Sequence, residues 1–343
     1  MILVLLGTAF LSSAETLSLG QAAGYNVFVF GNFTESNTDS QGPVAVGGSF
    51  APAGGGSFTI ASGQSGDGAG VWDLVVAGSF TDVNGTLGGG SAFVGGNMTW
   101  SDPTLPHNVY VNGSFSNPSD AGSVAGTVYY GGTFSSGDAL SHSKLGSPEA
   151  DPIDFVGAQT NLDSVSATLA SQTANGTVTD SYNTYTLTGA SSSINVFNLT
   201  GTSYSNATIN ITAPAGSTVI INVAGSSDSF SGGSINLSGV SANDVIWNFS
   251  SATALSVSSM AFYGTLLAPG AAFSGSSGQI NGQLIADSDA GSLELHDVLF
   301  EGALPAAESG QTTGIAATPE PGAWLMAIGG FILIAAVRRR SSR

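Results

Sequence analysis

The stretch "VGGNMTWSDPTLPHNVYVNGSF" (94–115) begins and ends with versions of one five-residue motif. The motif is a β-branched or aromatic residue, any residue, glycine, a small polar residue, and then Phe or Met. It occurs six times between residues 29 and 134, and successive motif glycines are 17, 30, 18, 17 and 19 residues apart. These glycines are Gly31, Gly48, Gly78, Gly96, Gly113 and Gly132.

A repeat of about 18 residues is too short for helical pairs or for propeller blades. It suits one coil of a β-solenoid, in which short strands and turns alternate and each coil stacks on the one before. We therefore predict a mostly β fold, a right-handed β-solenoid (β-helix), with Val and Phe pointing inward. Glycine would occupy a corner where a side chain would clash or φ must be positive. A β-sandwich with regularly spaced strands is the alternative.

Two segments interrupt the repeat. The Gly-rich residues 51–70 fall in the long step and read as a loop inserted into one coil. Residues 152–174 predict a helix beside the solenoid, with Asp151 as its cap, Asp154 in its first turn and Asn175-Gly176 at its end. The residues that we expect on the apolar face of this helix are Val156, Gln159, Leu162, Val165 and Leu169.

The charge of the chain is very unevenly distributed. The net charge is −18, and Lys144 is the only basic residue between Glu15 and Ala317. Such a surface repels phosphate backbones, so we expect no nucleic-acid partner. It tolerates cations, neutral glycans and surfaces that need no charge pairing. The chain has no cysteine, which excludes disulfides and thiol chemistry but not export.

Both ends of the chain have the composition of targeting segments. Residues 1–14 form an apolar run with Ser12 and Ala14 before a potential cleavage site after Ala14, which predicts a signal peptide; a buried strand is the alternative. Residues 322–337 carry no charge and precede an arginine cluster, which predicts a transmembrane helix with cytoplasmic arginines. A buried C-terminal helix is the alternative there. The clustered arginines are Arg338, Arg339 and Arg340.

The tail resembles the PEP-CTERM sorting signal of exported bacterial proteins. The resemblance rests on Pro319, Glu320 and Pro321, followed by the apolar run and the arginines, over residues 319–343. It implies processing by an exosortase, transient membrane anchoring, and delivery to the surface or matrix of a Gram-negative-type bacterium that makes exopolysaccharide. Residues 303–318 would be a linker to this tail.

A second resemblance covers nearly the whole exported part, residues 19–302. The segments "LGQAAGYNVFVFGNFTESNTDSQGPVAVGGSF" (19–50), "TVIINVAG" (218–225) and "FYGTLLAPGAAFSGSSGQINGQLIA" (262–286) resemble the choice-of-anchor A domain. The last segment also resembles the closing coils of ice-binding-type β-solenoids, along which one helix lies. The resemblance implies an adhesive surface module and supplies no catalytic residues.

Residues able to carry out chemistry are sparse. His107, His142 and His296 lack metal-ligand spacing, and "DSDAG" (287–291) is only a partial calcium loop. Calcium thus remains open, without a named site, and we expect no other cofactor. For a polysaccharide-active enzyme, Asp287/Asp289 or Glu294/Asp297 could serve as a glycosidase pair, although we expect them to be solvated turn acids. Lys144 is the only basic candidate for a lyase, and one group of aromatic residues could stack on sugars. That aromatic group would be Trp72, Trp100, Tyr129 and Tyr130, which we expect more often in core positions.

These observations favour a non-catalytic surface or matrix protein that binds exopolysaccharide or another surface ligand. A polysaccharide-active enzyme on a β-helix is the first alternative. An ice- or crystal-surface binder is the second, but it usually needs a regular Thr ladder, and the variable positions of the repeats read as irregular.

Overall fold

The chain folds into stacked coils that start in the middle of a solenoid. The computed structural model describes residues 17–64, 72–119 and 122–306, of which Leu17–Pro305 form one compact unit. Strand β1 (Val27–Val29) pairs in parallel with β3 (Val44–Val46) along one edge and with the last strand, β28 (Leu284–His296), along the other. The first and last coils of the chain are therefore neighbours.

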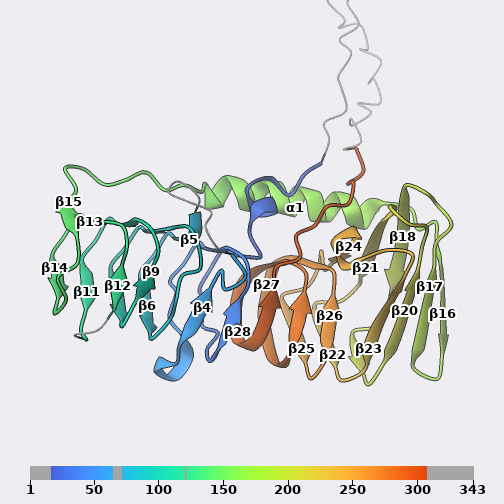
Figure 1. Ribbon diagram of the computed structural model, residues 1–343. Helices are drawn as coiled ribbons and strands as arrows, with labels where there is room; N and C mark the ends of the chain where they lie inside the picture. The colour runs from blue at the N-terminus through green and yellow to red at the C-terminus, as the bar shows by residue number, and fades with distance from the viewer. Residues whose placement is uncertain (1–16, 65–71, 120–121, 307–343) are drawn as a thin grey trace, which may run out of the picture. The chain divides into compact units, whose positions relative to one another are not determined.

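From β1 the coils run to one end of the solenoid at β15 (His142–Lys144). Helix α1 (Phe155–Ser171) then leads back along the coils, and the chain restarts at the opposite end with the hairpin of β16 (Thr177–Ser181) and β17 (Thr184–Thr188), followed by β18 (Ile194–Leu199). From there the coils wind back towards β28. Figure 1 shows the two half-solenoids meeting in the middle, with α1 lying along them. We call the contact between the first and last coils the seam.

The coils have three sides, each a ladder of strands that pair in parallel, apart from one antiparallel pair at the end of the third side. The helix side faces α1. Its other strands are β5 (Trp72–Val76), β7 (Ser91–Val94), β10 (Val109–Val111), β13 (Val128–Tyr130), β21 (Thr218–Val223), β24 (Val245–Asn248) and the first parts of β27 (Thr265–Asn281) and β28.

The second side, which we call the hydroxyl side, has no helix over it. It consists of β6 (Phe80–Val83), β8 (Met98–Ser101), β11 (Phe115–Asn117), β14 (Phe134–Ser136), β19 (Ser203–Ser205), β22 (Ser227–Ser231), β25 (Ala254–Ser258) and the middle parts of β27 and β28.

The third side completes each coil. It consists of β2 (Thr38–Ser40), β4 (Phe58–Ile60), β9 (Thr104–Leu105), β12 (Ser123–Val124), β16 (Thr177–Ser181), β17 (Thr184–Thr188), β20 (Thr208–Thr212), β23 (Ser234–Ser238), β26 (Ala261–Tyr263) and the last parts of β27 and β28. Short 3-10 helices lie at Gly20–Gly24 (η1), Ala53–Gly55 (η2) and Ala242–Asp244 (η3).

Parallel pairing decides between the two predicted folds. Every strand pair among the described residues is parallel except β16–β17, whereas a β-sandwich is built from antiparallel sheets. The solenoid prediction is therefore confirmed at the level of a parallel β-helix with one helix along its described part.

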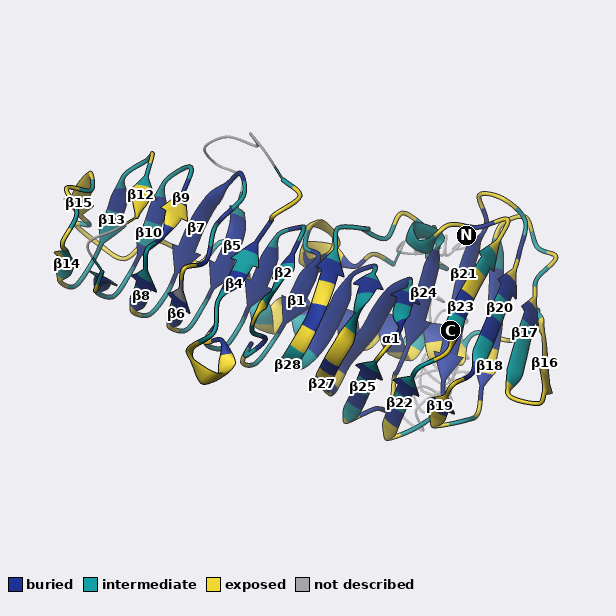
Figure 2. Cartoon of the chain, turned by 60° about the horizontal axis from the view of Figure 1, so that its bottom comes forward, coloured by how far each residue is buried: buried dark blue, intermediate teal, exposed yellow. Residues whose placement is uncertain are grey.

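The repeat motif works as predicted in the core. Its last residue points inward, and the rings stack from coil to coil: centroids of Phe33 and Phe50 are 4.8 Å apart, as are those of Phe50 and Phe80. Figure 2 shows the resulting alternation of buried and exposed bands along β27 and β28.

The motif glycines mark a close approach between coils. A Cβ on Gly78 would lie 2.5 Å from the carbonyl oxygen of Gly48, and one on Gly96 would lie 2.6 Å from the Oγ of Ser79. None of the six motif glycines has a positive φ. Of the two reasons predicted for glycine here, steric clash with the previous coil is therefore the one that applies.

The helix is shorter than predicted, and its cap is different. Asp154, not Asp151, is the N-cap, and its side chain accepts a hydrogen bond from the Gly157 N–H at 3.0 Å. The helix ends at Ser171 with an extended Gln172, before Asn175. Pro152 would be the first helical residue after an Asp151 cap, and this preference pointed to the earlier start.

The apolar face of the helix is also rotated from the predicted one. Val156 is 79% exposed, because it lies on the far side of the first turn. Leu162, Val165 and Leu169 are buried as predicted, together with Ala158.

Candidate functional surface

The helix side is closed to partners where α1 lies. Its outward-pointing apolar side chains are buried against Ala158, Leu162, Val165 and Leu169 of the helix. The covered residues are Phe28, Ile285, Leu267, Ile246, Ile220 and Val196.

A short polar ladder fixes the C-terminal half of the helix to this side. Asn248 donates from Nδ2 to the Ser166 carbonyl at 2.9 Å and to the Asn222 Oδ1 at 2.8 Å. Asn222 donates in turn to the Leu169 carbonyl at 2.9 Å. Buried amides in such a network specify one docking position for the helix, since any shift would leave them unpaired.

The aromatic residues considered as a sugar platform do not form one. Trp100 is fully buried, and Tyr130 packs against the core. Trp72 and Tyr129 are half-buried on the helix side beside Tyr110, where the Tyr110 and Tyr129 rings stack at 4.8 Å with an angle of 13°. These stacked rings turn their faces towards each other and not outward.

The hydroxyl side carries an in-register column of small side chains along the solenoid. Each position is set against the next by the strand registers and by the bridges Phe33–Asp289, Phe33–Phe50 and Phe50–Phe80. All its members are half-buried or exposed. We call this the hydroxyl column: Ser203, Ser229, Ser256, Ser274, Ala290, Thr34, Ala51, Thr81, Thr99, Ser116 and Ser135.

The column is not a regular Thr ladder, since it mixes Ser, Thr and Ala, but its positions lie in one register along the solenoid, which the repeats alone did not predict. The column is continuous because the last coil lies beside the first, so that it passes from Ala290 directly to Thr34 across the seam. A signal was present in the serine alternation "SDSFS" (227–231), "LSVSS" (255–259) and "FSGSS" (273–277).

A second column next to the first is locked by hydrogen bonds between coils. It holds the small polar residue of the repeat motif, and each side chain accepts a bond from the backbone of the next coil. Ser49 Oγ accepts from the Ser79 N–H at 3.2 Å, Ser79 Oγ from Asn97 at 3.2 Å, and Asn97 Oδ1 from Ser114 at 2.9 Å. These bonds hold the hydroxyl side rigid, because each coil is tied to its neighbour at the same place.

The third side ends in a second polar array, which we call the end sheet: β16, β17, β20 and β23. Its central row is Thr179, Thr186, Asn210 and Asn236, and Asn236 donates to Asn210 at 2.9 Å. The rows on either side contain only Thr and Ser: Ser181, Thr184, Thr208 and Ser234, then Thr177, Thr188, Thr212 and Ser238.

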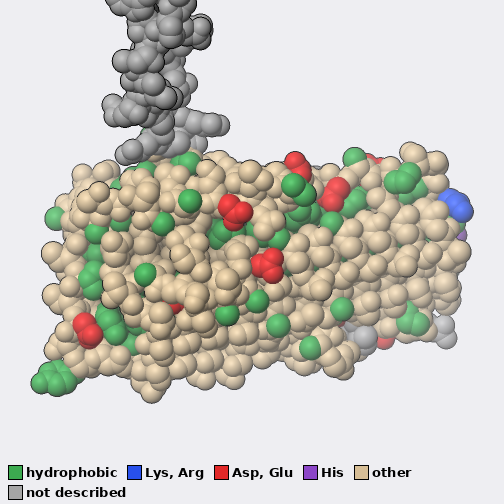
Figure 3. Space-filling model, turned by 180° about the vertical axis from the view of Figure 1, so that it is seen from behind, with side chains coloured by type: hydrophobic (Ala, Val, Ile, Leu, Met, Phe, Trp, Pro, Cys, Tyr) green, Lys and Arg blue, Asp and Glu red, His purple; other side chains and the backbone are tan. Residues whose placement is uncertain are grey.

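Neither column and none of these three rows contains a charged residue, although the chain carries −18. Figure 3 shows one side of the solenoid on which few acids are scattered over a largely uncharged surface, with a basic side chain at one end. An uncharged, rigid array of hydroxyl and amide groups suits a partner that is itself neutral and rich in hydrogen-bonding groups.

The predicted acid pairs do not converge. Asp289 is buried inside the coil, while Asp287 is half-exposed on the outside of the same strand. Glu294 Oε2 lies 3.4 Å from His296 Nε2, and the Asp297 carboxylate accepts from Gln64 Nε2 at 2.6 Å. Residues 287–291 lie within β28, so they do not form a calcium loop.

The remaining residues that could take part in chemistry, two on β15 and one between β9 and β10, do not gather at one site. Lys144 is exposed on β15 at one end of the solenoid, next to His142, whose ring stacks on Phe134 at 4.0 Å. His107 is half-buried between β9 and β10. Over residues 17–64, 72–119 and 122–306, no three His, Asp or Glu side chains come together as metal ligands.

The structure contains one pair of acids that the sequence did not reveal. Glu35 in the first coil and Asp289 in the last are 0% and 2% exposed, and they meet inside the seam. Burial raises the pKa of Asp289 to about 8; burial and the Asp289 carboxyl together raise the pKa of Glu35 well above its usual value. The Leu293 N–H donates to Glu35 Oε1 at 3.4 Å, the Ala290 backbone forms a hydrogen bond with the Asp289 carboxyl, and the two carboxyls form a hydrogen bond with each other.

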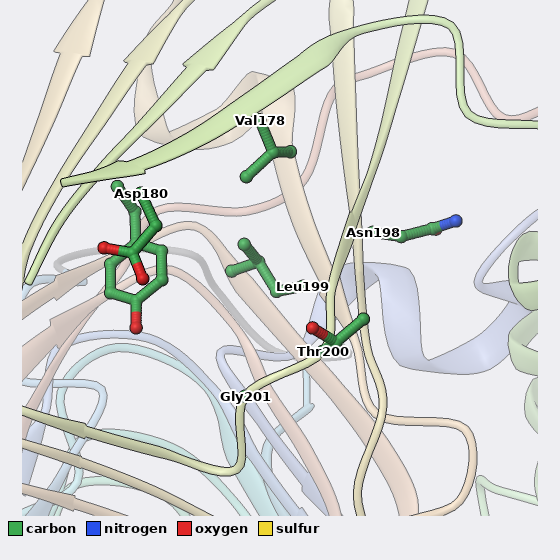
Figure 4. Close-up of a pocket in the computed structure, with 7 residues that line it drawn as sticks. Val178, Asp180, Asn198, Leu199, Thr200 and Gly201 are labelled. Carbon is green, nitrogen blue, oxygen red and sulfur yellow. The ribbon is translucent and has the colours of Figure 1, made fainter.

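Two shallow hollows lie at the β18 end of the solenoid. The first, of about 300 Å³, is lined by Val178, Asp180, Tyr185 and Leu199 among others (Figure 4). The second, of about 270 Å³, shares Asn198 to Thr200 and continues under the end of α1. Neither contains a pair of acids or a histidine.

The predicted signal peptide, most of the linker, and the tail with Pro319, Glu320, Pro321 and its span at 322–337 lie outside the described residues. Within the part that the structure describes, no helix is long and apolar enough to cross a bilayer.

Comparison with known proteins gives one match. The family model described as "Putative Ice-binding-like adhesive domain" matches residues 18–297, which is most of the chain and nearly all of the solenoid. No curated protein and no solved structure matches. The chain therefore belongs to this family of ice-binding-like adhesive domains.

Proposed function

We propose that this protein is a non-catalytic adhesin of the bacterial surface or extracellular matrix, and that its hydroxyl side binds exopolysaccharide. The observation that carries the proposal is the hydroxyl column, which repeats a small neutral side chain in register over the coils. Membership of an adhesive-domain family supports it.

The mechanism would be additive. Most coils offer a Ser or Thr hydroxyl that forms weak hydrogen bonds to sugar hydroxyls, and a long polymer that touches many coils binds tightly although each contact is weak. The lack of charge along the column avoids the desolvation cost that a carboxylate would impose on a neutral ligand.

The test is binding of the purified chain to the exopolysaccharide of its host, with the length of the polymer followed in parallel. Thr81→Gln and Ser274→Gln together place two bulky neutral side chains on the column and should lower retention. Thr104→Gln, an equally exposed change on the third side, is the control. Equal retention of all variants would remove the hydroxyl side from the mechanism, and shortening of the polymer would favour the enzyme alternative.

Binding to ice or another crystal surface is the second candidate. It is favoured by the same column, since a flat array with a constant spacing matches an ordered lattice better than a flexible polymer. Thermal hysteresis measured on the same variants separates the two candidates, because a matrix adhesin should show none.

We also propose that residues 319–343 act as a sorting tag that an exosortase processes, after a signal peptide at 1–14 has directed export. The support is the order of Pro-Glu-Pro, apolar run and arginines in the sequence. Replacing Pro319, Glu320 and Pro321 by alanine should leave the chain in the membrane fraction; unchanged release would contradict the proposal.

A further inference from the structure

The hairpin at the β18 end of the solenoid extends beyond the last coil. Its strands β16 and β17 are joined by Tyr182 and Asn183, which both have positive φ, of 49° and 64°. Two such residues form the tight turn that closes a two-residue hairpin. Strand β16 pairs with β17 alone, and all five of its residues are exposed.

Other strand edges at this end are blocked. Asn175 accepts from the Val196 N–H at 2.7 Å and donates to the Ile194 carbonyl at 2.9 Å, which occupies the free edge of β18. Asn183 donates to the Ser205 carbonyl of β19 at 2.8 Å. No comparable contact protects β16, and an open strand edge invites pairing with another chain.

The hairpin also carries exposed apolar side chains beside its polar rows. Of the three large hydrophobic side chains that are exposed in the described part of the chain, two lie on this hairpin: Val178 is 37% exposed and Tyr182 is 101% exposed. Val178 and Asp180 line the 300 Å³ hollow over the end of the core (Figure 4).

The backbone groups of the edge can be assigned from the register. In a two-residue hairpin the residues that flank the turn, here Ser181 and Thr184, exchange backbone hydrogen bonds, and every second pair after them does the same. Thr179 and Thr177 therefore direct their N–H and C=O groups at β17. Val178 and Asp180 direct theirs outward.

We propose that β16 is a self-association edge, at which the β16 strands of two copies pair antiparallel about Thr179. This register sets Val178 opposite Asp180 of the second copy, and these two residues exchange backbone N–H and C=O hydrogen bonds. The two-fold axis repeats the same exchange between Asp180 and Val178 of the second copy, so all four outward groups of each edge are paired. The two Asp180 carboxylates do not oppose each other. The same register brings the exposed Tyr182 next to Gly176 of the second copy.

A second copy fits this edge better than an unrelated strand because the edge is self-complementary. Thr177 would face Ser181, and Thr179 would face Thr179, so the polar rows continue across the two-fold axis without a charge in them. The end sheets of both copies become one sheet, which doubles the width of the uncharged array.

The test is sedimentation velocity of the full-length chain over a range of concentrations, with three variants of Val178. Val178→Asp places a carboxylate opposite Asp180 of the second copy at two symmetric positions and should weaken dimerisation by about tenfold. Val178→Lys removes the same apolar side chain but creates two cross-strand ion pairs, so it should tighten dimerisation at low salt and lose the gain at high salt. These two variants are matched controls for each other.

Val178→Pro gives an independent reading. It removes an N–H that points away from β17, so the hairpin can persist while the edge is blocked. We expect a monomer with an unchanged melting temperature. A wild-type chain that stays monomeric at every concentration would overturn the proposal, and so would a dimer that Val178→Asp and Val178→Lys shift equally and in the same direction.

Discussion

The acid pair in the seam makes the stability of the solenoid depend on pH in a predictable direction. Burial raises the pKa of both Glu35 and Asp289 in the folded protein, so the fold favours the protonated forms of the pair. In the unfolded chain both carboxyls ionise near their ordinary values. Stability from this source is fully present below about pH 4 and is lost as pH rises towards about 8, because unfolding releases protons throughout that window.

The size of the effect follows from the shift. The pKa of Asp289 rises from 3.8 to about 8, which is roughly 4 units, and each unit corresponds to about 1.4 kcal/mol. The coupled pair should therefore lower the free energy of unfolding by several kcal/mol, on the order of 5, between pH 4 and pH 8. Domains are usually stable by about 5–15 kcal/mol, so the effect is large.

The measurement is urea unfolding, followed by the fluorescence of the buried Trp100 and Trp247, at several pH values from 4 to 9. The comparison is with Glu35→Gln/Asp289→Asn, which keeps the shape and the hydrogen bond of the pair but cannot ionise. The difference between the double variant and the wild type should grow with pH and level off above pH 8. Asp163→Asn, on the exposed side of α1, controls for a change in net charge.

Parallel pH profiles for wild type and double variant would refute the reasoning. They would mean that the two carboxyls are solvated, and therefore that the first and last coils do not close around them. A wild type that gains stability relative to the variant as pH rises would have the wrong sign and would indicate a bound cation between the two acids.

Three further predictions concern the coils and the helix. Gly78→Ala should cost about 1–3 kcal/mol of unfolding free energy, because its Cβ would lie 2.5 Å from a carbonyl oxygen, whereas Gly146→Ala meets nothing within 4 Å and should be neutral in the same thermal melts. Asn248→Ala should cost about 1–3 kcal/mol in chemical unfolding by leaving its partners under α1 unpaired, and Asn236→Ala on the exposed end sheet should cost much less; equal losses would contradict the docking role of the ladder. Asp154→Ala should remove the N-cap and lower the melting temperature by an amount equivalent to about 1 kcal/mol, and no change would show that α1 is held by packing alone.

Whether Asp287 and Asp289 form a catalytic pair depends on where they lie in the fold and cannot be decided from their spacing in the sequence. Asp287 and Asp289 are two residues apart, which would place both side chains on one face of a regular strand. In the structure Asp289 points into the core at the seam, while Asp287 lies at the corner before it. Spacing along the chain cannot show where a coil turns, so the sequence could not exclude this pair.

The helix shows the same limit on a smaller scale. Its existence and its buried residues Leu162, Val165 and Leu169 follow from the apolar period, which local geometry sets. Its first residue does not, because Asp151 and Asp154 are both good caps. Asp154 caps the helix, whereas Asp151 accepts a hydrogen bond from the Ile153 N–H at 2.9 Å in a turn before the helix.

The sequence by itself determined the coil. A glycine that recurs about every 18 residues, between an inward Val and an inward Phe, is a local pattern, and stacking identical positions is the way to bury all of those side chains at once. Only the tertiary structure decided the order of the coils. It sets residues 27–40 against residues 284–295 across the seam, and both the continuous hydroxyl column and the buried acid pair depend on that arrangement. Contacts between segments more than 250 residues apart leave no periodic trace in the chain, because each partner satisfies its own local pattern equally well without the other.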